Sequence, residues 1–419
     1  KKKTLNLLPI LPHTFSKAPY SYVEGVYPAY VKSGRGSHLQ DVDGNDYIDY
    51  VLGLGPIILG YNYPEVNQAI MDTLKEGTTF SMPHYLEIEF ADLLCSVIPS
   101  AEMAKFTKTG SDAVTAAVRA ARAITGKDKV AYCGGGGVWH DWFIISTSRN
   151  LGVPKFNREL IKIFQYNKIE TLEQIFEQNK GQIAAVCIEP MVYEPPKTFL
   201  KDVQRIAHEN EAILIFDEVV TGFRMSLGGA QQYFDIKPDL SCFGKAIGNG
   251  MPLGAITGKK EYMKIFDEIF YSTTYAGEIL SLAAGKATIS TIKEKNVITY
   301  LWNKGSELKT NFQKIVRQMN LPVDVIGLPH RIGLIVKDDS GAESITLKSI
   351  LYQECVKRGI IFGSGSIFHT FSHTDDDTKK TVEAFIDAAE ILRRSIDSED
   401  PSKFLHGNPM KPVLKFPVL

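Results

Sequence analysis

The sequence has few cysteines, almost no net charge and no long apolar run. Its five cysteines are scattered and form no Cys-x-x-Cys pair, so neither a disulfide framework nor a cysteine metal site is expected. Lysine and arginine (47) nearly balance aspartate and glutamate (48), which leaves no basic surface for nucleic acid or an anionic membrane. No run approaches the roughly 18 apolar residues that span a bilayer. These absences predict a reduced, cytoplasmic globular protein with neither nucleic acid nor membrane as partner.

The length and the first segments of the chain indicate several packed parts. A chain of 419 residues is too long for one ordinary core and suits two or three subdomains. Near the N-terminus an apolar stretch is short and interrupted by Asn6, Pro9 and Pro12, so we do not expect a secretory signal. Two alternating runs around Asp43-Gly44 predict a β-hairpin.

Two short apolar runs end in chemically active side chains. Residues 213–216 are followed by Asp217 and Glu218, and residues 240–243 are followed, after one glycine, by Lys245. Such runs predict buried strands of a parallel sheet, whose carboxyl ends form the ligand site in open α/β folds. One interpretation is a salt bridge between Asp217 and Lys245. The other is a lysine that forms a Schiff base with a pyridoxal aldehyde, while the aspartate keeps the ring nitrogen protonated.

The segments DEVVTGFR and FGKAIGNGMPLGAITG resemble the signature of class III pyridoxal-phosphate aminotransferases, and within them the glutamate-1-semialdehyde aminomutase branch. The resemblance extends from about residue 15 to about residue 395. It implies pyridoxal 5'-phosphate as cofactor and an α/β, fold-type-I enzyme. It also implies that Lys245 is the Schiff-base lysine, that Asp217 partners the pyridine nitrogen and that Val219 packs against one ring face.

The same resemblance implies that the chain is divided into three segments. Residues 1–65 would form an N-terminal arm and part of a small domain, and residues 66–290 a large cofactor-binding domain with a mainly parallel sheet flanked by helices. Residues 291–419 would complete the small α+β domain and end in an extended tail.

A strand-like run at residues 103–106 opens into Thr109, Gly110, Ser111 and Asp112, followed by a helical pattern. Ser111 or Asp112 is a good helix N-cap, and a helix N-terminus suits a phosphate dianion. From these residues alone, plain helix capping is the favoured interpretation. The resemblance assigns phosphate binding to Thr109, Gly110 and Ser111.

The glycine-rich stretch VAYCGGGGVWHDWF departs from the aromatic-His-Gly run usual in this family. Either Trp139 and His140 replace that pair, or Gly136 and Gly137 stand in its place. We expect Trp139 to stack on the cofactor with His140 beside it, because one face of the ring would otherwise be bare.

Three further positions follow from the resemblance or from spacing. Glu189 closes the apolar run AAVCIEP and would lie near the Schiff base and the cofactor hydroxyl. Thr274 would reach the phosphate of the neighbouring subunit's cofactor, which implies a homodimer with shared active sites. His369 and His373 have i,i+4 spacing, but no third ligand is apparent, so no metal site is expected.

The expected reaction is transfer of an amino group from a small-molecule amino donor to an aldehyde or keto acceptor. The alternative is the aminomutase reaction, which moves the amino group within one molecule. Two departures disfavour it: EIFYSTTY fills the place of a glycine-rich gate, and Lys17 stands where an arginine is usual. A non-catalytic pyridoxal-phosphate-binding protein is a remote third possibility, since no DNA-binding extension is present.

Overall fold

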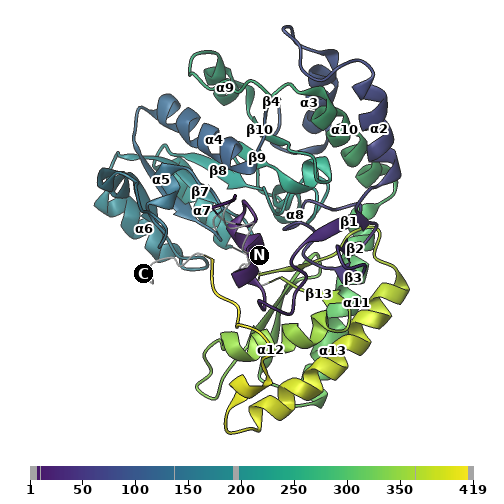
Figure 1. The fold of residues 1–419 in the computed structure, drawn as a ribbon. Coiled ribbons are helices and arrows are strands. Elements are labelled where there is room, and N and C mark those ends of the chain that lie inside the picture. Colours follow the sequence, from purple (N-terminus) through teal and green to yellow (C-terminus); the bar gives the residue numbers. More distant parts are fainter. Residues whose placement is uncertain (1–6, 10, 136, 192–197, 364, 414–419) are drawn as a thin grey trace. The chain divides into compact units, whose positions relative to one another are not determined.

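The computed structural model describes residues 7–9, 11–135, 137–191, 198–363 and 365–413 (Figure 1). The chain divides into two compact units. We call Pro64–Ile298 the sheet unit, and Lys1–Tyr63 together with Thr299–Val413 the terminal unit, because it combines both ends of the chain.

A seven-stranded sheet organises the described part of the sheet unit, in the order β4-β10-β9-β8-β7-β5-β6. β6, β5, β7, β8 and β9 run parallel, whereas β10 is antiparallel to both β9 and β4. The predicted α/β class with a mainly parallel sheet is therefore confirmed. The strands are β4 (Met103–Thr107), β5 (Lys129–Cys133), β6 (Ile161–Ile163), β7 (Ile183–Ile188), β8 (Ile213–Asp217), β9 (Leu240–Phe243) and β10 (Gly254–Gly258).

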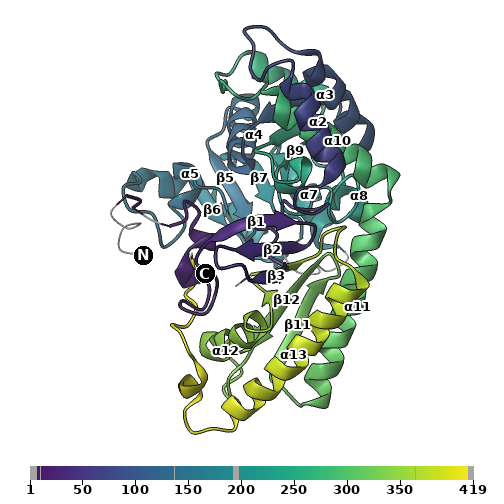
Figure 2. The same ribbon diagram turned by 45° about the vertical axis from the view of Figure 1, so that its right-hand side comes forward.

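Alternation along the strands gives this sheet two apolar faces. Tyr132, Cys187 and Ile215 belong to the core cluster that contains the small residues of α4, while Phe216 faces the cluster of α6 and α7. The strands and the covering helices can be followed in Figure 2. The helices of this unit are α2 (Pro64–Leu74), α3 (Tyr85–Val97), α4 (Gly110–Thr125), α5 (Asp141–Ile144), α6 (Ile169–Gln178), α7 (Phe199–Glu209), α8 (Ala230–Phe234), α9 (Lys260–Met263) and α10 (Ile279–Glu294).

In the described part of the terminal unit, two small sheets combine with three α-helices. The predicted hairpin is confirmed: β2 and β3 pair antiparallel, and Asp41 Oδ1 accepts hydrogen bonds from the backbone N–H groups of Asp43 and Asn45 in the turn. The two sheets of the terminal unit have the strand orders β1-β2-β3-β13 and β11-β12-β14. The elements are β1 (Val31–Arg35), β2 (His38–Asp41), β3 (Asp46–Asp49), β11 (Val323–Leu328), β12 (Arg331–Val336), β13 (Ile360–Ile361), β14 (Ile367–Phe368), α12 (Ile345–Val356) and α13 (Asp375–Ile396), with α11 (Val297–Gln318) entering from the sheet unit.

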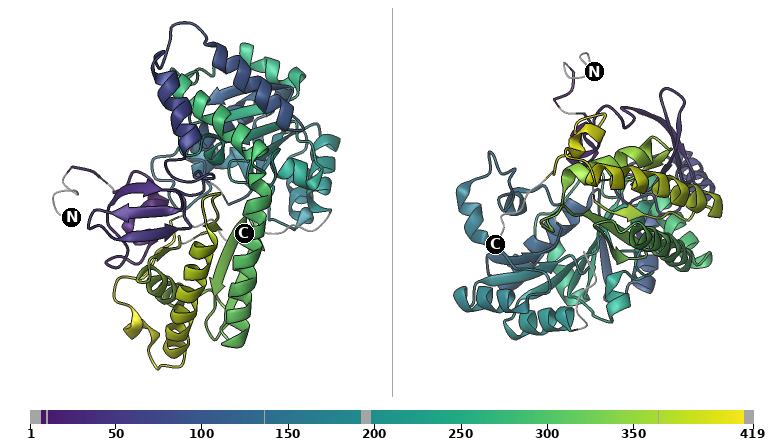
Figure 3. Two further views of the ribbon diagram at one scale, coloured as in Figure 1. Left: turned by 90° about the vertical axis from the view of Figure 1, so that its right-hand side faces the viewer. Right: turned by 90° about the horizontal axis from the view of Figure 1, so that it is seen from below.

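Two long helices hold the core of the terminal unit. α11 and α13 pack through Phe312 and Phe385, whose rings stack at 4.0 Å between centroids, and both helices are visible in Figure 3. α13 begins with a capping box, in which the Thr374 side chain accepts from the backbone N–H of Asp377 and the Asp377 carboxylate accepts from that of Thr374. The helix therefore has a defined start despite its polar first turn.

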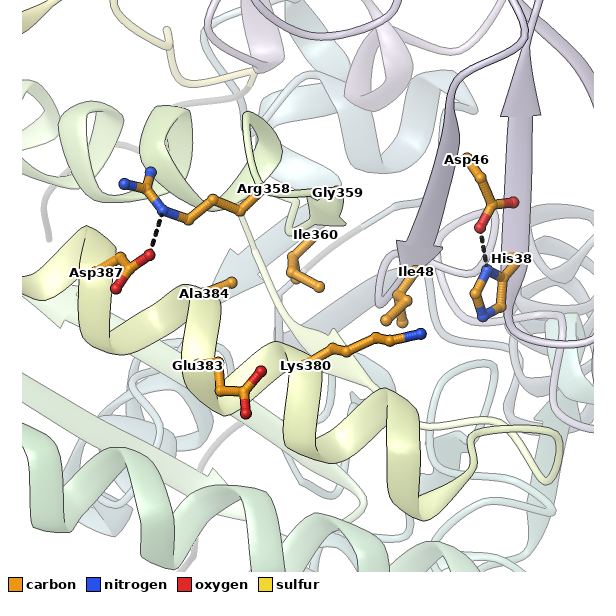
Figure 4. A pocket seen from close by; sticks show the side chains of 10 residues that line it. All are labelled: His38, Asp46, Ile48, Arg358, Gly359, Ile360, Lys380, Glu383, Ala384 and Asp387. Carbon is orange, nitrogen blue, oxygen red and sulfur yellow. Dashed lines mark hydrogen bonds and ion pairs between the residues drawn. The ribbon is translucent and has the colours of Figure 1, made fainter.

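A hollow of about 390 Å³ lies within the terminal unit, between β2, β3, β13 and α13. Figure 4 shows charged pairs at its two ends. His38 Nδ1 lies 2.5 Å from Asp46 Oδ2, and Arg358 Nε donates to Asp387 Oδ2 at 3.0 Å. His38 Nε2 also lies 2.9 Å from Asp377 Oδ1. These pairs tie the hairpin and β13 to α13, and the hollow contains none of the site residues predicted from the sequence.

None of the helices that the structure describes is long and apolar enough to cross a membrane.

Candidate active site

Three neighbouring strands of the sheet unit deliver the predicted reactive side chains to one edge. Asp217 ends β8, Glu189 directly follows β7, and Lys245 comes two residues after β9. These strands are parallel and adjacent, so their carboxyl ends coincide. Lys245 has a left-handed backbone with φ 47° and opens a short 3₁₀ helix, Lys245–Gly248, after the extended Gly244. This sharp turn takes the lysine out of the sheet direction immediately after the strand.

The Asp217 carboxylate is buried, and its surroundings disfavour its negative charge. Burial and then the charge of Glu189 raise the pKa of Asp217 to about 7, against the opposing effects of the Val219 N–H and the Lys245 cation. Its hydrogen bond from Val219 N has a length of 3.1 Å. Removing a carboxylate from water is costly unless a cation or hydrogen bonds compensate it. The edge therefore favours an additional positive or proton-donating group next to Asp217.

Glu218, adjacent to Asp217 in sequence, has a structural position. Its fully buried carboxylate accepts hydrogen bonds from Thr221 Oγ1 and from the backbone N–H groups of Ala230 and Gln231, at 2.8 and 2.9 Å for the two backbone contacts. It thus satisfies the first turn of α8. Of the two consecutive carboxylates, only Asp217 is available to the site.

The start of α4 differs from the expectation. The N-cap is Thr109, not Ser111 or Asp112, and the reason is a capping box. The Thr109 hydroxyl accepts from Asp112 N at 3.1 Å, while Asp112 Oδ2 accepts from Thr109 N at 2.9 Å. Within the described chain, the N–H groups of Gly110 and Ser111 have no hydrogen-bond acceptor. These two donors form an anion-accepting end of the helix, and the Ser111 hydroxyl donates to Gly137 O at 3.1 Å.

Gly110, Val219 and Gly244 are in close contact. A Cβ on Gly110 would lie 2.6 Å from Val219 Cγ2, and a Cβ on Gly244 would lie 3.3 Å from Gly110 Cα. Glycine at Gly110 is therefore required for the helix start to approach the loop after β8. This approach places the Gly110 and Ser111 donors, Val219 and Lys245 around one part of the sheet edge.

The glycine-rich loop after β5 contacts Glu189. Gly135 N donates to Glu189 Oε2 at 2.9 Å, and a Cβ on Gly134 would lie 2.8 Å from Glu189 Cβ. Any side chain at Gly134 would thus displace Glu189. The absence of side chains on this loop lets it close over the carboxylate.

Trp139 and His140 lie on the flank of α4. The Trp139 indole is 64% exposed and stacks on His140 at 4.1 Å between ring centroids. His140 Nδ1 lies 2.9 Å from Thr115 Oγ1, a residue in the second turn of α4. The alternative position for the stacking pair includes Gly136, which lies outside the described residues.

Thr274 lies in the turn before α10 and is exposed. The turn is fixed at its end by Glu278, which caps α10 by accepting from Leu280 N and Ser281 N and forms a 2.9 Å ion pair with Lys108. Thr274 is thus a solvent-facing hydroxyl of this chain rather than a member of the cluster around Lys245.

One residue near the site falls outside the predicted set. Sequence reasoning missed Tyr132, a buried tyrosine of β5 whose pKa is raised by burial and then by the charge of Asp217. Strand alternation could have placed it on the Asp217 face of the sheet, although no motif marks it. Among the described residues, no group of three or more His, Cys, Asp and Glu side chains could hold a metal ion.

Residues 20–389 match the family model described as aminotransferase class-III. The chain belongs to the class-III aminotransferase family. It is 35% identical over 392 residues to a 3-aminobutyryl-CoA aminotransferase of Cloacimonas acidaminovorans, covering 91% of this chain and 93% of that protein. It is 34% identical over 387 residues to a glutamate-1-semialdehyde 2,1-aminomutase of Archaeoglobus fulgidus, covering 85% and 92%.

Solved transaminases have the same fold. An omega-transaminase from Sphaerobacter thermophilus is 26% identical, with a TM-score of 0.86 and coverage of 94% of this chain and 96% of that one. The FumI protein of a Sphingopyxis species, solved in its PLP internal aldimine form, is 24% identical with a TM-score of 0.89, covering 96% and 98%. These matches confirm the fold-type-I architecture and the predicted aminotransferase class, and they indicate pyridoxal 5'-phosphate as the cofactor of this chain.

The residues at the sheet edge fit this cofactor. A protonated pyridine nitrogen would supply the positive group that the buried Asp217 lacks. The N–H groups of Gly110 and Ser111, which have no acceptor among the described residues, would donate hydrogen bonds to a phosphate at the start of α4. Lys245, whose cation lowers the pKa of Asp217 against the effect of burial, would reach the aldehyde. The chain therefore provides side chains for the ring nitrogen and the aldehyde of the cofactor, and backbone N–H groups for its phosphate.

Proposed function

We propose that this class-III aminotransferase transfers an amino group between two separate small molecules, with Lys245 as the covalent attachment point of pyridoxal 5'-phosphate. The observation that supports this most is the convergence of Lys245, Asp217 and Glu189 at the ends of three adjacent parallel strands, within the residues matched by the family. On this proposal the sheet unit is the cofactor-binding domain.

Each residue has a defined task in the proposal. When bound, the cofactor supplies an aldehyde for attachment of amines and a ring that accepts an electron pair. Asp217 would hold a proton on the ring nitrogen, and Val219 would support one ring face. Lys245 Nζ would attach the cofactor and would accept and return the proton at the substrate carbon. Glu189 would lie beside the cofactor hydroxyl.

Phosphate binding is assigned to Thr109, Gly110 and Ser111, with different contributions. The capping box uses the Thr109 side chain and its backbone N–H, and the Ser111 hydroxyl donates to Gly137 O. Gly110 N and Ser111 N are therefore the proposed donors, and Thr109 positions them. Stacking of Trp139 on the cofactor, with His140 beside it, stays a prediction.

The site is proposed to be completed by a second copy of the chain. A dianionic phosphate needs more donors than one helix start provides. Thr274 is exposed, as a hydroxyl that serves the partner's site would be in a single chain. α2, α3 and their connection expose large apolar side chains, including Met82 (76%), Ile88 (75%) and Tyr85 (54%). An exposed apolar face of this kind is typical of a subunit interface, and we propose a cytoplasmic homodimer.

Intermolecular transfer and the aminomutase reaction are distinguished by the fate of the first product. The sequence similarity supports both, since the relatives include an aminotransferase and an aminomutase. We favour separate donor and acceptor because of the EIFYSTTY segment and Lys17. In a single turnover without acceptor, an aminotransferase releases one equivalent of carbonyl product and keeps the amine-loaded cofactor. Failure to release any carbonyl product from a panel of amino donors, with efficient isomerisation of glutamate-1-semialdehyde, would establish the aminomutase instead.

A further inference from the structure

Tyr132 carries a buried hydroxyl that has no partner in the part of the chain that the structure describes. The side chain is 1% exposed, and its hydroxyl has no hydrogen-bond partner within the described residues. A buried hydroxyl without a partner costs free energy, and such groups in folded proteins usually serve a bound group or a reaction. The hydroxyl therefore needs a function that offsets its cost.

The ring of Tyr132 is held in place by its neighbours. It makes edge contacts with Phe143 at 4.8 Å and with Trp142 at 6.3 Å between ring centroids. Trp142 is in turn fixed by the hydrogen bond of its Nε1 to Thr115 Oγ1 at 2.9 Å. With this packing the hydroxyl cannot turn to solvent, so it remains directed at its present surroundings.

Those surroundings are the carboxylates of the active site. Tyr132 pairs with Cys187 across β5 and β7, and Cys187 pairs with Ile215 of β8, two residues before Asp217 and thus on the same face. A Cβ on Gly134 would lie 3.1 Å from the Tyr132 hydroxyl oxygen and 2.8 Å from Glu189 Cβ. Burial first, and then the charges that include Asp217 and Glu189, raise the pKa of Tyr132 well above its ordinary value. The hydroxyl is therefore neutral and offers its hydrogen next to two carboxylates.

We propose that Tyr132 is a positioning residue whose hydroxyl donates a hydrogen bond to the Asp217–Glu189 carboxylate pair when the cofactor is in place. The inference rests on the proposed function of these carboxylates. The hydrogen bond would restrain the carboxylates against the ring and partly offset their negative charge. In the cofactor-free protein the buried hydroxyl lowers the free energy of unfolding, whereas in the loaded protein it contributes to cofactor binding.

Tyr132→Phe tests this, because it removes the hydroxyl and keeps the ring packing. Tyr352→Phe is the matched control: Tyr352 is also fully buried with an unpartnered hydroxyl, but it belongs to α12 of the other unit. We expect Tyr132→Phe to raise the Kd for pyridoxal 5'-phosphate about tenfold. The midpoint of the pH titration of the bound cofactor's absorbance should move to higher pH, because loss of the donor leaves the site more negative and favours the protonated chromophore.

The melting temperature of the cofactor-free protein distinguishes the proposed role of Tyr132 from a purely structural one. We expect both Tyr132→Phe and Tyr352→Phe to leave that temperature unchanged or raised, and we expect Tyr352→Phe to keep the wild-type Kd and pH midpoint. A Tyr132→Phe protein with wild-type Kd and midpoint would overturn the inference, and so would a loss of cofactor-free stability that accounts for the weaker binding. If the wild-type protein itself does not bind the cofactor covalently, the proposed function fails before Tyr132 is tested.

Discussion

Replacing Gly110 with alanine is expected to damage both packing and cofactor binding. The added Cβ would lie 2.6 and 2.7 Å from the two γ-carbons of Val219, when ordinary carbon contacts begin near 3.5 Å. Either Val219 or the start of α4 must therefore move by nearly an ångström. Overpacking of this kind costs about 1–3 kcal/mol of unfolding free energy. Because the Val219 N–H is hydrogen-bonded to Asp217, the displacement also disturbs the carboxylate at the ring nitrogen.

Gly137→Ala is the matched control, since a Cβ at Gly137 meets no atom within 4 Å. Cofactor-free melting temperatures and the Kd for pyridoxal 5'-phosphate should be measured for both variants. We expect Gly110→Ala to melt lower and to bind at least about tenfold more weakly, while Gly137→Ala stays within about 0.5 kcal/mol of wild type. If the two variants behave alike in melting and in binding, the close packing of the helix start against Val219 does not have the consequence assigned to it.

Three further outcomes are expected. Asp217→Asn should keep cofactor binding and lose about 10²–10³-fold in kcat, because an amide cannot hold the ring proton by charge; a kcat within about threefold of wild type would contradict the role. The hydrogen bond to Asp377 raises the pKa of His38 to about 9, so its stabilising contribution is complete below pH 6.5 and is lost as the pH rises to about 9. We expect a loss of about 1 kcal/mol after solvent screening, seen in melting temperatures across that range and absent in His38→Asn. Mixing inactive Lys245→Ala chains with chains that carry a bulky residue at Thr274 should restore about a quarter of wild-type activity, because half of the re-paired dimers are mixed and each has one intact site; no restoration in proven mixed dimers would exclude shared sites.

Much of the fold and the reactive edge was predictable from local pattern. Short apolar runs ending in Asp217 and before Lys245 are strands because β-structure buries both faces of a parallel sheet. The separate positions of Asp217 and Glu218 follow from the two-residue period of a strand, which sends consecutive side chains to opposite faces. What the pattern did not reveal is the partner of Glu218, since Ala230 and Gln231 lie more than ten residues away and are brought close only by the tertiary fold.

The errors and gaps have local physical causes. Thr109 rather than Ser111 caps α4 because the reciprocal bonds with Asp112 favour a start two residues earlier, and several polar residues in succession hide such a choice. Around Trp139 the glycine run has no side-chain pattern, so neither period nor register could be read from it. Tyr132 escaped notice because a buried tyrosine in an apolar strand is usual; only the missing partner of its hydroxyl marks it.

The covalent link at Lys245 is the central claim and is tested most directly by chemical trapping. The purified protein loaded with pyridoxal 5'-phosphate is reduced with borohydride, digested, and analysed by mass spectrometry. The account predicts one phosphopyridoxyl group per chain, on the peptide that contains Lys245, and none in folded Lys245→Ala protein, which should also lack turnover. A modification carried by a different lysine, or near wild-type turnover in the Lys245→Ala protein, would contradict the account.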